Sequence, residues 1–385
     1  MAAPYASLPR PRRPSHLTEP VSMSTRPTHS PTRGTTVMTD TTGARTSEPT
    51  LMRAIGFTRN RPVDDPDALV ERDVPRPELG PHDLLVEVRA VSVNPVDVKQ
   101  RAHADAHGFR VLGYDAAGVV VATGDAVTLF EIGDHVYYAG ALNRPGSNSQ
   151  VHAVDERIVG RKPASLDWAD AAALPLTTLT AYEALFDKLH LTPSSAGTLL
   201  IVGAAGGVGS IMIQLAKVLL PGVRAIGTAS RPETTDWVMS LGADAVVDHH
   251  GDIAAHVLEV APDGVDWIFT AASAVPGAIE AYVRIAKPFG QIVAIDDPSH
   301  LDVVSLKTKA LSWHWEFMFA RSMHDAADLI EQHRILNRVA ELIDEGRVRS
   351  TATEYLSPVD PEQLITAHRI VESGRSIGKV VVFDE

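Results

Sequence analysis

The chain has 385 residues, 44% of them hydrophobic and 22% charged, and it carries a formal net charge of −13 at pH 7, which is an ordinary composition for a globular chain of two or three domains. The acidic balance disfavours nucleic acids and anionic membranes as partners, and no apolar run approaches the roughly 18 residues of a membrane-spanning helix. The absence of cysteine excludes disulfides, thiolate metal ligands and a cysteine nucleophile, and we expect a cytoplasmic protein.

Residues 1–51 are expected to form a disordered N-terminal extension. Pro, Ser and Thr dominate this segment and lysine is absent, so it cannot bury enough apolar surface to offset the entropy of ordering. An arginine-containing, acid-poor composition is also typical of organellar transit peptides. The interpretation that we favour is an extended start, because Met52 immediately precedes the first patterned strand.

Short strands and turns are predicted for the next hundred residues. Apolar or alternating runs separated by glycine and proline lie at 52–57, 83–91, 111–121, 134–139 and 150–154. Many short strands at close spacing are typical of a β-barrel-like domain, and this region shows no segment with a helical period.

The pattern changes at Ser165, and residues 165–191 are predicted to be mostly helical with a break at Pro175. Strands and helices then alternate, with strands at 199–203, 223–228, 245–247, 265–270 and 290–295 and helices at 208–220, 232–241, 252–260 and 276–286. This βα repeat predicts a parallel sheet with helices on both faces, which is the doubly wound Rossmann arrangement.

Three further segments complete the chain. The aromatic run at 312–319 is interpreted as a strand. A helix is predicted over 325–345, with an apolar face that ends at Ile343 and with Gly346 as its C-terminal cap. Strand and turn signals return over 351–385.

The glycine cluster between the strand at 199–203 and the helix at 208–220 is a candidate anion site. A glycine turn before a helix leaves unpaired N–H groups at the helix N-terminus and lets a phosphate approach closely. The segment departs from G-x-G-x-x-G because Ala204 stands at the first glycine position, while Gly206 and Gly209 occupy the second and third. The alternative is a tight turn without a ligand.

The end of the second strand of this repeat points to the identity of the nucleotide. A carboxylate that holds the ribose 2′-hydroxyl is expected about 20 residues past the glycines, but Ser230 and Arg231 stand there instead. Arginine is a good bidentate partner for phosphate, so NADPH is favoured over NADH. The alternative is that Arg231 only starts a helix with Pro232.

Four motifs in order resemble those of a known family. They are Val93-Asn94-Pro95-Val96-Asp97, Gly113-Tyr114-Asp115-Ala116-Ala117-Gly118-Val119, Leu174-Pro175-Leu176-Thr177-Thr178-Leu179-Thr180-Ala181-Tyr182 and Ala205-Gly206-Gly207-Val208-Gly209. The chain resembles the medium-chain dehydrogenase/reductase superfamily, in the quinone-oxidoreductase-like branch whose members are often called zinc-type alcohol dehydrogenase-like proteins. The resemblance runs from about Met52 to the C-terminus.

This resemblance implies an α/β fold in which a Rossmann doubly wound parallel sheet is joined to a GroES-like β-barrel catalytic domain. The implied domains are the GroES-like catalytic domain at 52–173, the Rossmann NADP-binding domain at 174–322, and a helix with a C-terminal return to the catalytic domain at 323–385. Substrate and nicotinamide would meet between them, at the carboxyl ends of the strands.

The zinc ligands of the family are missing at their expected positions. Zinc-dependent relatives use two cysteines and a histidine, but the matching segments here contain Ser92, Tyr114 and Thr177. We therefore predict no metal. The chemistry would be direct hydride transfer to an electrophile whose oxygen is polarised by hydrogen-bond donors.

The resemblance also implies the site residues. Asn94 and Tyr114 are the candidate donors to the substrate, and Asp115 would orient one of them; the alternative for Tyr114 is a hydroxyl packed in the cleft wall. The residues implied to bind the cofactor are Thr177 or Thr178 near the nicotinamide phosphate, Ala204, Gly206, Gly207, Val208 and Gly209 on the pyrophosphate, Ser230 and Arg231 on the 2′-phosphate, Ser273 and Ile295 at strand ends beside the nicotinamide, and Lys379.

The resulting hypothesis is an NADPH-dependent oxidoreductase that reduces a small electrophile, a quinone or an activated C=C or carbonyl compound, without catalytic zinc. A zinc-type alcohol dehydrogenase with a non-standard metal site and a non-catalytic NADPH-binding sensor remain as alternatives. The aromatic segment 312–319 is predicted to pair two copies into a homodimer or to line an apolar substrate pocket.

Overall fold

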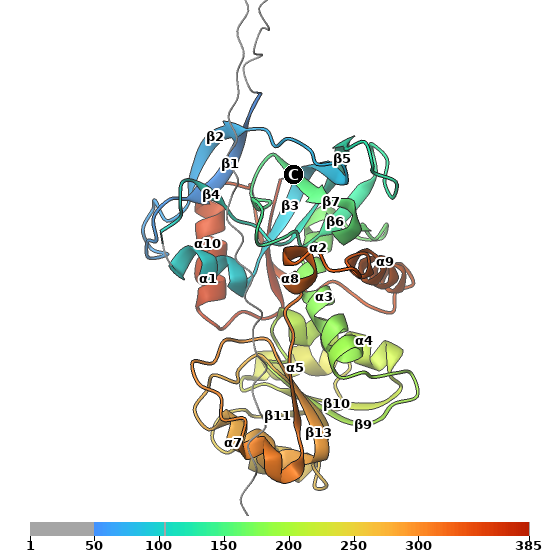
Figure 1. Cartoon of the computed structure of the whole chain (residues 1–385). Helices are drawn as coiled ribbons and strands as arrows, with labels where there is room; N and C mark the ends of the chain where they lie inside the picture. The colour runs from blue at the N-terminus through green and yellow to red at the C-terminus, as the bar shows by residue number, and fades with distance from the viewer. Residues whose placement is uncertain (1–49, 104, 385) are drawn as a thin grey trace, which may run out of the picture. The chain divides into compact units, whose positions relative to one another are not determined.

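The computed structural model describes residues 50–103 and 105–384, so the predicted N-terminal extension lies almost entirely outside the described residues. From Pro49 onward the chain forms one unit. Figure 1 shows this unit in two parts, with the blue and green strands β1–β8 in one part and the yellow and orange strands of a second sheet in the other.

The second sheet has six parallel strands in the order β11-β10-β9-β12-β13-β14. Numbered from its first strand, this is the 3-2-1-4-5-6 order of a Rossmann fold, so the sequence prediction of a doubly wound sheet is confirmed. The strands are β9 (Ala196–Val202), β10 (Gly222–Thr228), β11 (Ala245–Val247), β12 (Val265–Thr270), β13 (Ala286–Ala294) and β14 (Ser312–Trp315).

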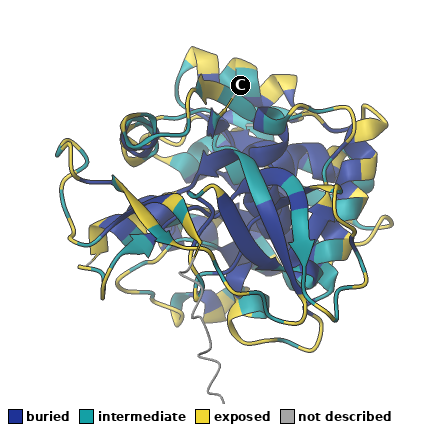
Figure 2. Cartoon of the chain, turned by 90° about the horizontal axis from the view of Figure 1, so that it is seen from above, coloured by how far each residue is buried: buried dark blue, intermediate teal, exposed yellow. Residues whose placement is uncertain are grey.

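Both faces of this sheet are buried, which explains the nearly continuous apolar runs of its strands. On one face, Leu200 pairs in register with Ile226 and Ile268 and packs against α6 (Ile253–Val260) and α7 (Ala278–Ile285). On the other face, Ile201 and Phe269 join the core that includes α4 (Gly207–Leu219) and α5 (Pro232–Ser240). Figure 2 shows buried strands surrounded by helices with exposed outer faces.

The remaining strands form a three-stranded sheet in the order β2-β1-β4 and a seven-stranded sheet in the order β15-β16-β3-β5-β6-β8, with β7 paired to β3. The last strand of the chain, β16, therefore returns to the first part and pairs antiparallel with β3. These strands are β1 (Leu51–Phe57), β2 (Val70–Pro75), β3 (Asp83–Val93), β4 (Arg110–Val111), β5 (Ala116–Thr123), β6 (His135–Tyr138), β7 (Val151–Asp155), β8 (Val159–Arg161), β15 (Ala352–Leu356) and β16 (Lys379–Phe383).

The described residues also form further helices and short helical turns. They are α1 (Pro95–His103), α2 (Trp168–Ala172), α3 (Pro175–Tyr182), the π-helical turn η2 (Glu183–Lys188), α8 (Phe319–Met323), α9 (Glu331–Asp344) and α10 (Pro361–Glu372), together with the 3-10 turns η1 (Glu156–Ile158) and η3 (Ser305–Lys309). No helix of residues 50–103 and 105–384 is long and apolar enough to cross a membrane.

The structure corrects three secondary-structure predictions. The segment 351–385, predicted as strands and turns, contains the helix α10, which begins with Pro361 at its first position and is capped by Asp360, whose carboxylate accepts the Gln363 backbone N–H at 2.8 Å. The region before residue 160 does contain a helix, α1, which begins after Asn94 with proline at its first position; the Asp97 carboxylate accepts the Asn94 backbone N–H at 2.9 Å and so stabilises this start. The predicted helix over 325–345 begins only at Glu331, because Asp325 adopts a left-handed backbone with φ of 44°. The predicted cap Gly346 does adopt a positive φ of 70°.

The aromatic segment 312–319 is only partly a strand. β14 ends at Trp315, and the chain then turns into α8 at Phe319. β14 is the edge strand of the six-stranded sheet.

Candidate cofactor and substrate cleft

A cleft of about 1470 Å³ runs between the two parts of the described chain. It lies where the order of the parallel sheet reverses, because Gly203 after β9 and Ala271 after β12 both line it. Ligands of open α/β sheets bind at this reversal, at the carboxyl ends of the strands. The opposite wall includes Asn94 from the end of β3 and Lys379 from the start of β16.

The glycine turn after β9 forms one wall of the cleft. α4 begins there with Gly206 as N-cap and with no side chain to cap its free N–H groups, which therefore remain available to an anion. Gly209 allows a close approach of backbone to backbone, since a Cβ there would lie 2.5 Å from the Cα of Ala204. The turn thus fits a dinucleotide phosphate.

Four of the five predicted residues of this turn line the cleft, namely Gly206, Gly207, Val208 and Gly209. Ala204 is fully buried and does not line the cleft. A Cβ added at Gly227 of β10 would lie 2.9 Å from the Ala204 Cβ, so the methyl group packs against the neighbouring strand. Ala204 thus supports the turn by packing against β10 and does not face the cleft.

The cleft is basic beyond the end of β10. Ser230 and Arg231 line it as predicted, and they are joined by Arg375 and Ser376 from the loop before β16. Arg231 Nη2 donates a hydrogen bond of 2.9 Å to the carbonyl oxygen of Arg375. Arg375 and Ser376 were not predicted as site residues, because only the tertiary structure brings that loop to the end of β10.

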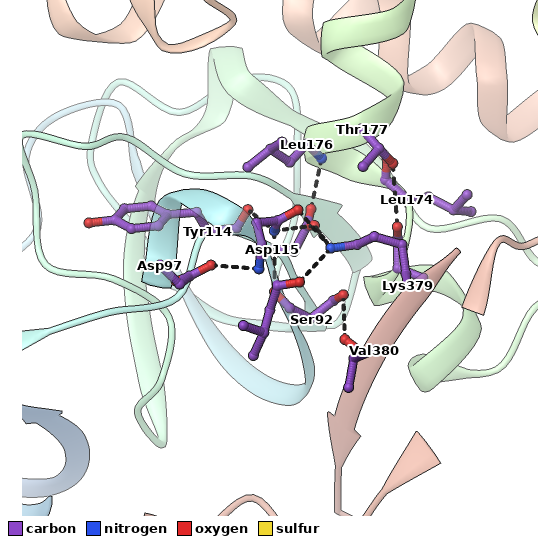
Figure 3. Close-up of polar contacts among 12 residues, drawn as sticks. Ser92, Asp97, Tyr114, Asp115, Leu174, Leu176, Thr177, Lys379 and Val380 are labelled. Carbon is purple, nitrogen blue, oxygen red and sulfur yellow. Dashed lines mark hydrogen bonds and ion pairs between the residues drawn. The ribbon is translucent and has the colours of Figure 1, made fainter. Parts of the chain in front are cut away.

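Lys379 lies at the centre of a cluster of polar side chains in the cleft wall (Figure 3). Its Nζ donates to the Val93 carbonyl oxygen at 2.9 Å and to Asn94 Oδ1 at 2.7 Å, and it lies 3.3 Å from Asp115 Oδ2. Asp115 in turn accepts the backbone N–H of Leu176 at the start of α3 through its other oxygen, at 2.7 Å. The cluster thereby joins β3, β16 and the first turn of α3.

Burial governs the protonation of this cluster. It raises the pKa of Asp115 to about 6 against the opposing influence of the Lys379 charge, and it lowers the pKa of Lys379. Burial also raises the pKa of Asp97 to about 7, although Asp97 accepts the backbone N–H groups of Asn94 and Gly113. Near neutral pH, one buried cation thus lies among two carboxyl groups that bind protons more readily than usual.

The structure places two predicted catalytic side chains differently from the sequence interpretation. Asn94 lines the cleft, but its amide nitrogen donates to Asp115 Oδ2 at 2.8 Å and its amide oxygen accepts Lys379, so the amide is already engaged. Tyr114 is fully buried outside the cleft lining; its hydroxyl accepts a hydrogen bond from Arg110 Nη2 and its ring edge packs on Phe319. Asp115 also lies outside the lining, but it contacts two lining residues, Asn94 and Lys379.

Of the residues predicted to lie near the nicotinamide, some line the cleft and others do not. Thr177 and Ile295 line the cleft, and Thr177 Oγ1 donates to the Leu174 carbonyl oxygen at 3.1 Å. Thr178 is buried and its hydroxyl has no hydrogen-bond partner among the described residues, while Ser273 Oγ donates to Asp296 at 2.6 Å. Neither Thr178 nor Ser273 lines the cleft.

Two further features of the lining were not predicted as site residues. Lys99 of α1 and Asp297 after β13 form an ion pair of 2.6 Å between the two parts of the chain. Glu316, the residue after β14, also belongs to the lining, but its side chain is fully buried. A lone acid after an aromatic run carries no local sequence signal, so Glu316 was not identifiable beforehand.

The donor set does not fit a zinc ion. Across residues 50–103 and 105–384, no three histidine, aspartate or glutamate side chains come close enough to hold a metal, and the chain contains no cysteine.

Two protein-family descriptions match the described chain. Residues 80–164 match "Alcohol dehydrogenase GroES-like domain" and residues 241–382 match "Zinc-binding dehydrogenase".

Individual relatives extend the match beyond these two segments. The chain is 39% identical over 336 residues to a zinc-type alcohol dehydrogenase-like protein of Staphylococcus epidermidis, covering 86% of this chain and 99% of the relative. It is 32% identical over 325 residues to the NADPH-dependent alkenal/one oxidoreductase, chloroplastic, of Arabidopsis thaliana, covering 82% of this chain and 75% of that protein.

Solved structures agree with the fold. The structure is similar to that of a putative zinc-dependent alcohol dehydrogenase from Rhizobium etli, with a TM-score of 0.84, 47% identity and coverage of 87% of this chain and 99% of the other. It is also similar to the quinone oxidoreductase of Pseudomonas syringae pv. Tomato, with a TM-score of 0.73, 26% identity and coverage of 86% and 99%.

Proposed function

Because the chain belongs to the medium-chain dehydrogenase/reductase family, among the zinc-type alcohol dehydrogenase-like proteins and the quinone and enone oxidoreductases, we propose that it is an NADPH-dependent reductase of quinones and of C=C bonds conjugated to a carbonyl group. Members of this family are oxidoreductases that bind nicotinamide cofactors. The reduced nicotinamide, when bound, supplies a hydride.

The observation that carries the choice of NADPH is the charge at the end of β10. Arg231, Arg375 and two serines line the cleft there. The carboxyl groups among the lining residues, Asp297 and Glu316, follow β13 and β14 instead. Glu233 pairs with Arg231 at 3.3 Å but is not among the residues that line the cleft. With no acid in the lining here and with two guanidinium groups, this end of the cleft favours a 2′-phosphate.

Roles also follow for the glycine turn and for the Lys379 cluster. The uncapped start of α4 at Gly207 binds the pyrophosphate. Lys379 and Thr177 flank that turn, since a Cβ on Gly207 would lie 2.7 Å from Lys379 Cδ and 2.9 Å from Thr177 Cγ2. Asn94 and Asp115 position the ammonium group of Lys379, which polarises the end of the cleft where the substrate oxygen binds.

The class of substrate follows from the same lining. Leu142, Phe317 and Met318 supply apolar surface, which suits a small aromatic or conjugated electrophile. The Arabidopsis relative is named for alkenal and enone reduction and the Pseudomonas structure for quinone reduction. An unactivated alcohol would need a Lewis acid, and the described donor set offers no site for one.

The test is the decay of nicotinamide absorbance with the purified full-length chain. We expect turnover of NADPH with 1,4-benzoquinone or 2-cyclohexenone, slower turnover of NADH, and no effect of a metal chelator. Loss of turnover in chelator would favour the zinc-type alcohol dehydrogenase. Tight NADPH binding without turnover of either acceptor would favour the non-catalytic sensor.

The domain division and the oligomeric state are part of the proposal as well. We propose that residues 52–173 form the catalytic domain, that residues 174–322 form the NADP-binding domain, and that residues 323–385 form a helix and the return to the catalytic domain. We also propose that β14 pairs with its counterpart in a second copy, because it is a sheet edge whose last residue, Trp315, is about half exposed.

A further inference from the structure

The segment between α10 and β16 runs along one wall of the cleft and links its basic end to Lys379. We call residues 374–379, from the loop to the first residue of β16, the strap. Arg375 and Ser376 line the cleft with the residues after β10, and Gly378 and Lys379 line it next to the glycine turn. Exposure falls along the strap, from exposed Arg375 to buried Lys379. One short segment thus spans the distance from the region assigned to the 2′-phosphate to the buried cation.

The inner end of the strap is fixed to both parts of the chain. The backbone N–H of Gly378 donates to the Ala205 carbonyl oxygen of the glycine turn at 2.8 Å. The backbone N–H of Lys379 donates to the Thr351 carbonyl oxygen before β15, also at 2.8 Å. Gly378 adopts a positive φ of 54°, and a Cβ there would lie 2.2 Å from the Thr351 oxygen. Because the backbone is closely packed on both sides, a displacement of the strap also changes the position of Lys379.

The outer end of the strap presents a guanidinium group without an acidic partner. Arg231 Nη2 donates to the Arg375 carbonyl oxygen at 2.9 Å, which brings the end of β10 to the strap. The Arg375 side chain forms no ion pair with a carboxylate of the described residues, whereas Arg231 lies 3.3 Å from Glu233. Ser376 adds a hydroxyl group to the same lining. A 2′-phosphate bound here would contact both arginines and so join the strap to the Rossmann sheet.

We propose that Arg375 is a specificity-determining residue that binds the 2′-phosphate from the strap, so that NADPH holds the strap, and with it Lys379, in place for reduction. NADH lacks the 2′-phosphate and leaves the outer end of the strap without this anchor. This inference rests on the proposed reductase function. It makes the 2′-phosphate contribute to the reaction step as well as to affinity, because binding energy from a remote group is used to position a group beside the substrate.

The key variant is Arg375→Ala, which removes an exposed side chain. At saturating concentrations of each cofactor, wild-type kcat with 1,4-benzoquinone should be about five- to tenfold higher with NADPH than with NADH, and the variant should lose this difference. The Kd for NADPH should rise about tenfold, as for a lost charge-assisted hydrogen bond. Both constants for NADH should stay unchanged. Arg375→Lys keeps a cation and should restore part of kcat with NADPH.

Arg369→Ala is the matched control. Arg369 lies on α10 and lines a neighbouring cavity but not the cleft, and its side chain is 49% exposed. The variant removes the same charge close to the strap, so an effect of net charge alone would appear in both variants. We expect wild-type kinetics with both cofactors.

Two outcomes would overturn the proposal. If Arg375→Ala raised only the Kd for NADPH and left kcat at saturation unchanged, the 2′-phosphate would not act on Lys379 through the strap. If the variant lost activity equally with NADPH and NADH, Arg375 would not distinguish the two cofactors. The split between Kd and kcat thus separates positioning from simple affinity.

Hydrogen–deuterium exchange tests the strap without turnover. Saturating NADPH should slow exchange in the peptide that contains residues 374–379 more than saturating NADH does, and Arg375→Ala should remove the difference. Equal protection by the two cofactors in wild-type protein contradicts the proposal. If wild-type protein bound NADPH but consumed none with either acceptor, the proposed function would fail, while the exchange difference would still decide whether the 2′-phosphate holds the strap.

Discussion

The ammonium group of Lys379 is where the separate parts of the site meet. Residues nearly 300 positions apart come together there, since Lys379 binds Asn94 of the first part, and the loop before β16 forms a bridge from Gly378 to Gly206 of the glycine turn. Lys379 therefore connects Asn94, at the end of β3, with the glycine turn after β9. Its removal should affect stability and binding together.

We predict that Lys379→Met destabilises the protein in a pH-dependent way. Without the cation, Asp115 and Asp97 are left buried and unpaired, so their pKa values should rise further and the folded state should hold protons that the unfolded chain releases. Stability relative to wild type should fall little at pH 5 and increasingly above about pH 6, reaching about 3–5 kcal/mol at pH 8. Urea unfolding across this pH range, with Lys307→Met on the exposed η3 turn as control, measures the effect. A loss that does not vary with pH would disprove the charge argument.

Arg231 tests the preference for NADPH at a single side chain. Its guanidinium group lines the cleft and is about 28% exposed. Arg231→Ala should weaken NADPH binding by about 1–3 kcal/mol, as for a lost charge-assisted pair, and should leave NADH nearly unchanged. Calorimetric titration with both cofactors measures the difference. Equal losses for the two would show that Arg231 does not bind the 2′-phosphate.

At the scale of elements, the glycine turn and the start of α4 form one wall of the cleft. Two of its residues, Gly206 and Gly209, lack a Cβ atom for different reasons. A Cβ at Gly209 would collide with backbone atoms, whereas a Cβ at Gly206 would meet nothing closer than the Gly203 carbonyl oxygen at 3.5 Å. Gly209 is therefore required for the fold of the turn, and Gly206 leaves space that faces the cleft. The alanine variants of these two glycines therefore distinguish an effect on binding from an effect on folding.

We expect Gly206→Ala to fold normally but to bind NADPH at least tenfold more weakly, because its methyl group occupies space intended for the phosphate. Gly209→Ala should instead lower the free energy of unfolding by about 1–3 kcal/mol through overpacking. Thermal unfolding and fluorescence titration of NADPH compare the variants. Undiminished binding by Gly206→Ala would place the phosphate elsewhere.

At the scale of the whole molecule, the edge of the six-stranded sheet presents apolar surface. Trp315 and Phe317 are 49% and 50% exposed at or just beyond β14, and Trp313 packs edge-on against Trp315. Exposed edge strands pair readily with another copy. The same segment continues into Glu316 and Met318 of the cleft wall, so pairing would also brace the substrate side.

We predict that wild-type protein is a dimer and that Trp315→Lys makes it a monomer, since a charge on the edge opposes pairing. Light scattering after size-exclusion chromatography gives the mass directly. Phe289→Lys, a charge at a more exposed aromatic position within β13, should not change the mass. A monomeric wild type would remove β14 as the interface.

The sequence by itself determined the elements with a clear period. Strands buried on both faces need continuous apolar runs, and an amphipathic helix needs its 3.6-residue stripe, so the βα repeat, the glycine turn and the buried face of α9 with Leu336 and Val339 were all predictable. α1 was missed because its nine residues are too few and too polar for a visible stripe. Its Asn94-Pro95 start was the available signal.

The tertiary structure alone decided which side chains share the cleft. The orientation of Tyr114 toward Arg110, the engagement of Asn94 by Lys379, and the pairing of Glu316 with Glu183 depend on contacts between residues far apart in the chain. Local pattern carries no information on such contacts, because side-chain direction and protonation are set by whichever groups packing brings near. The sequence thus determined the βα repeat and its glycine turn, and only packing decided which side chains surround the cleft.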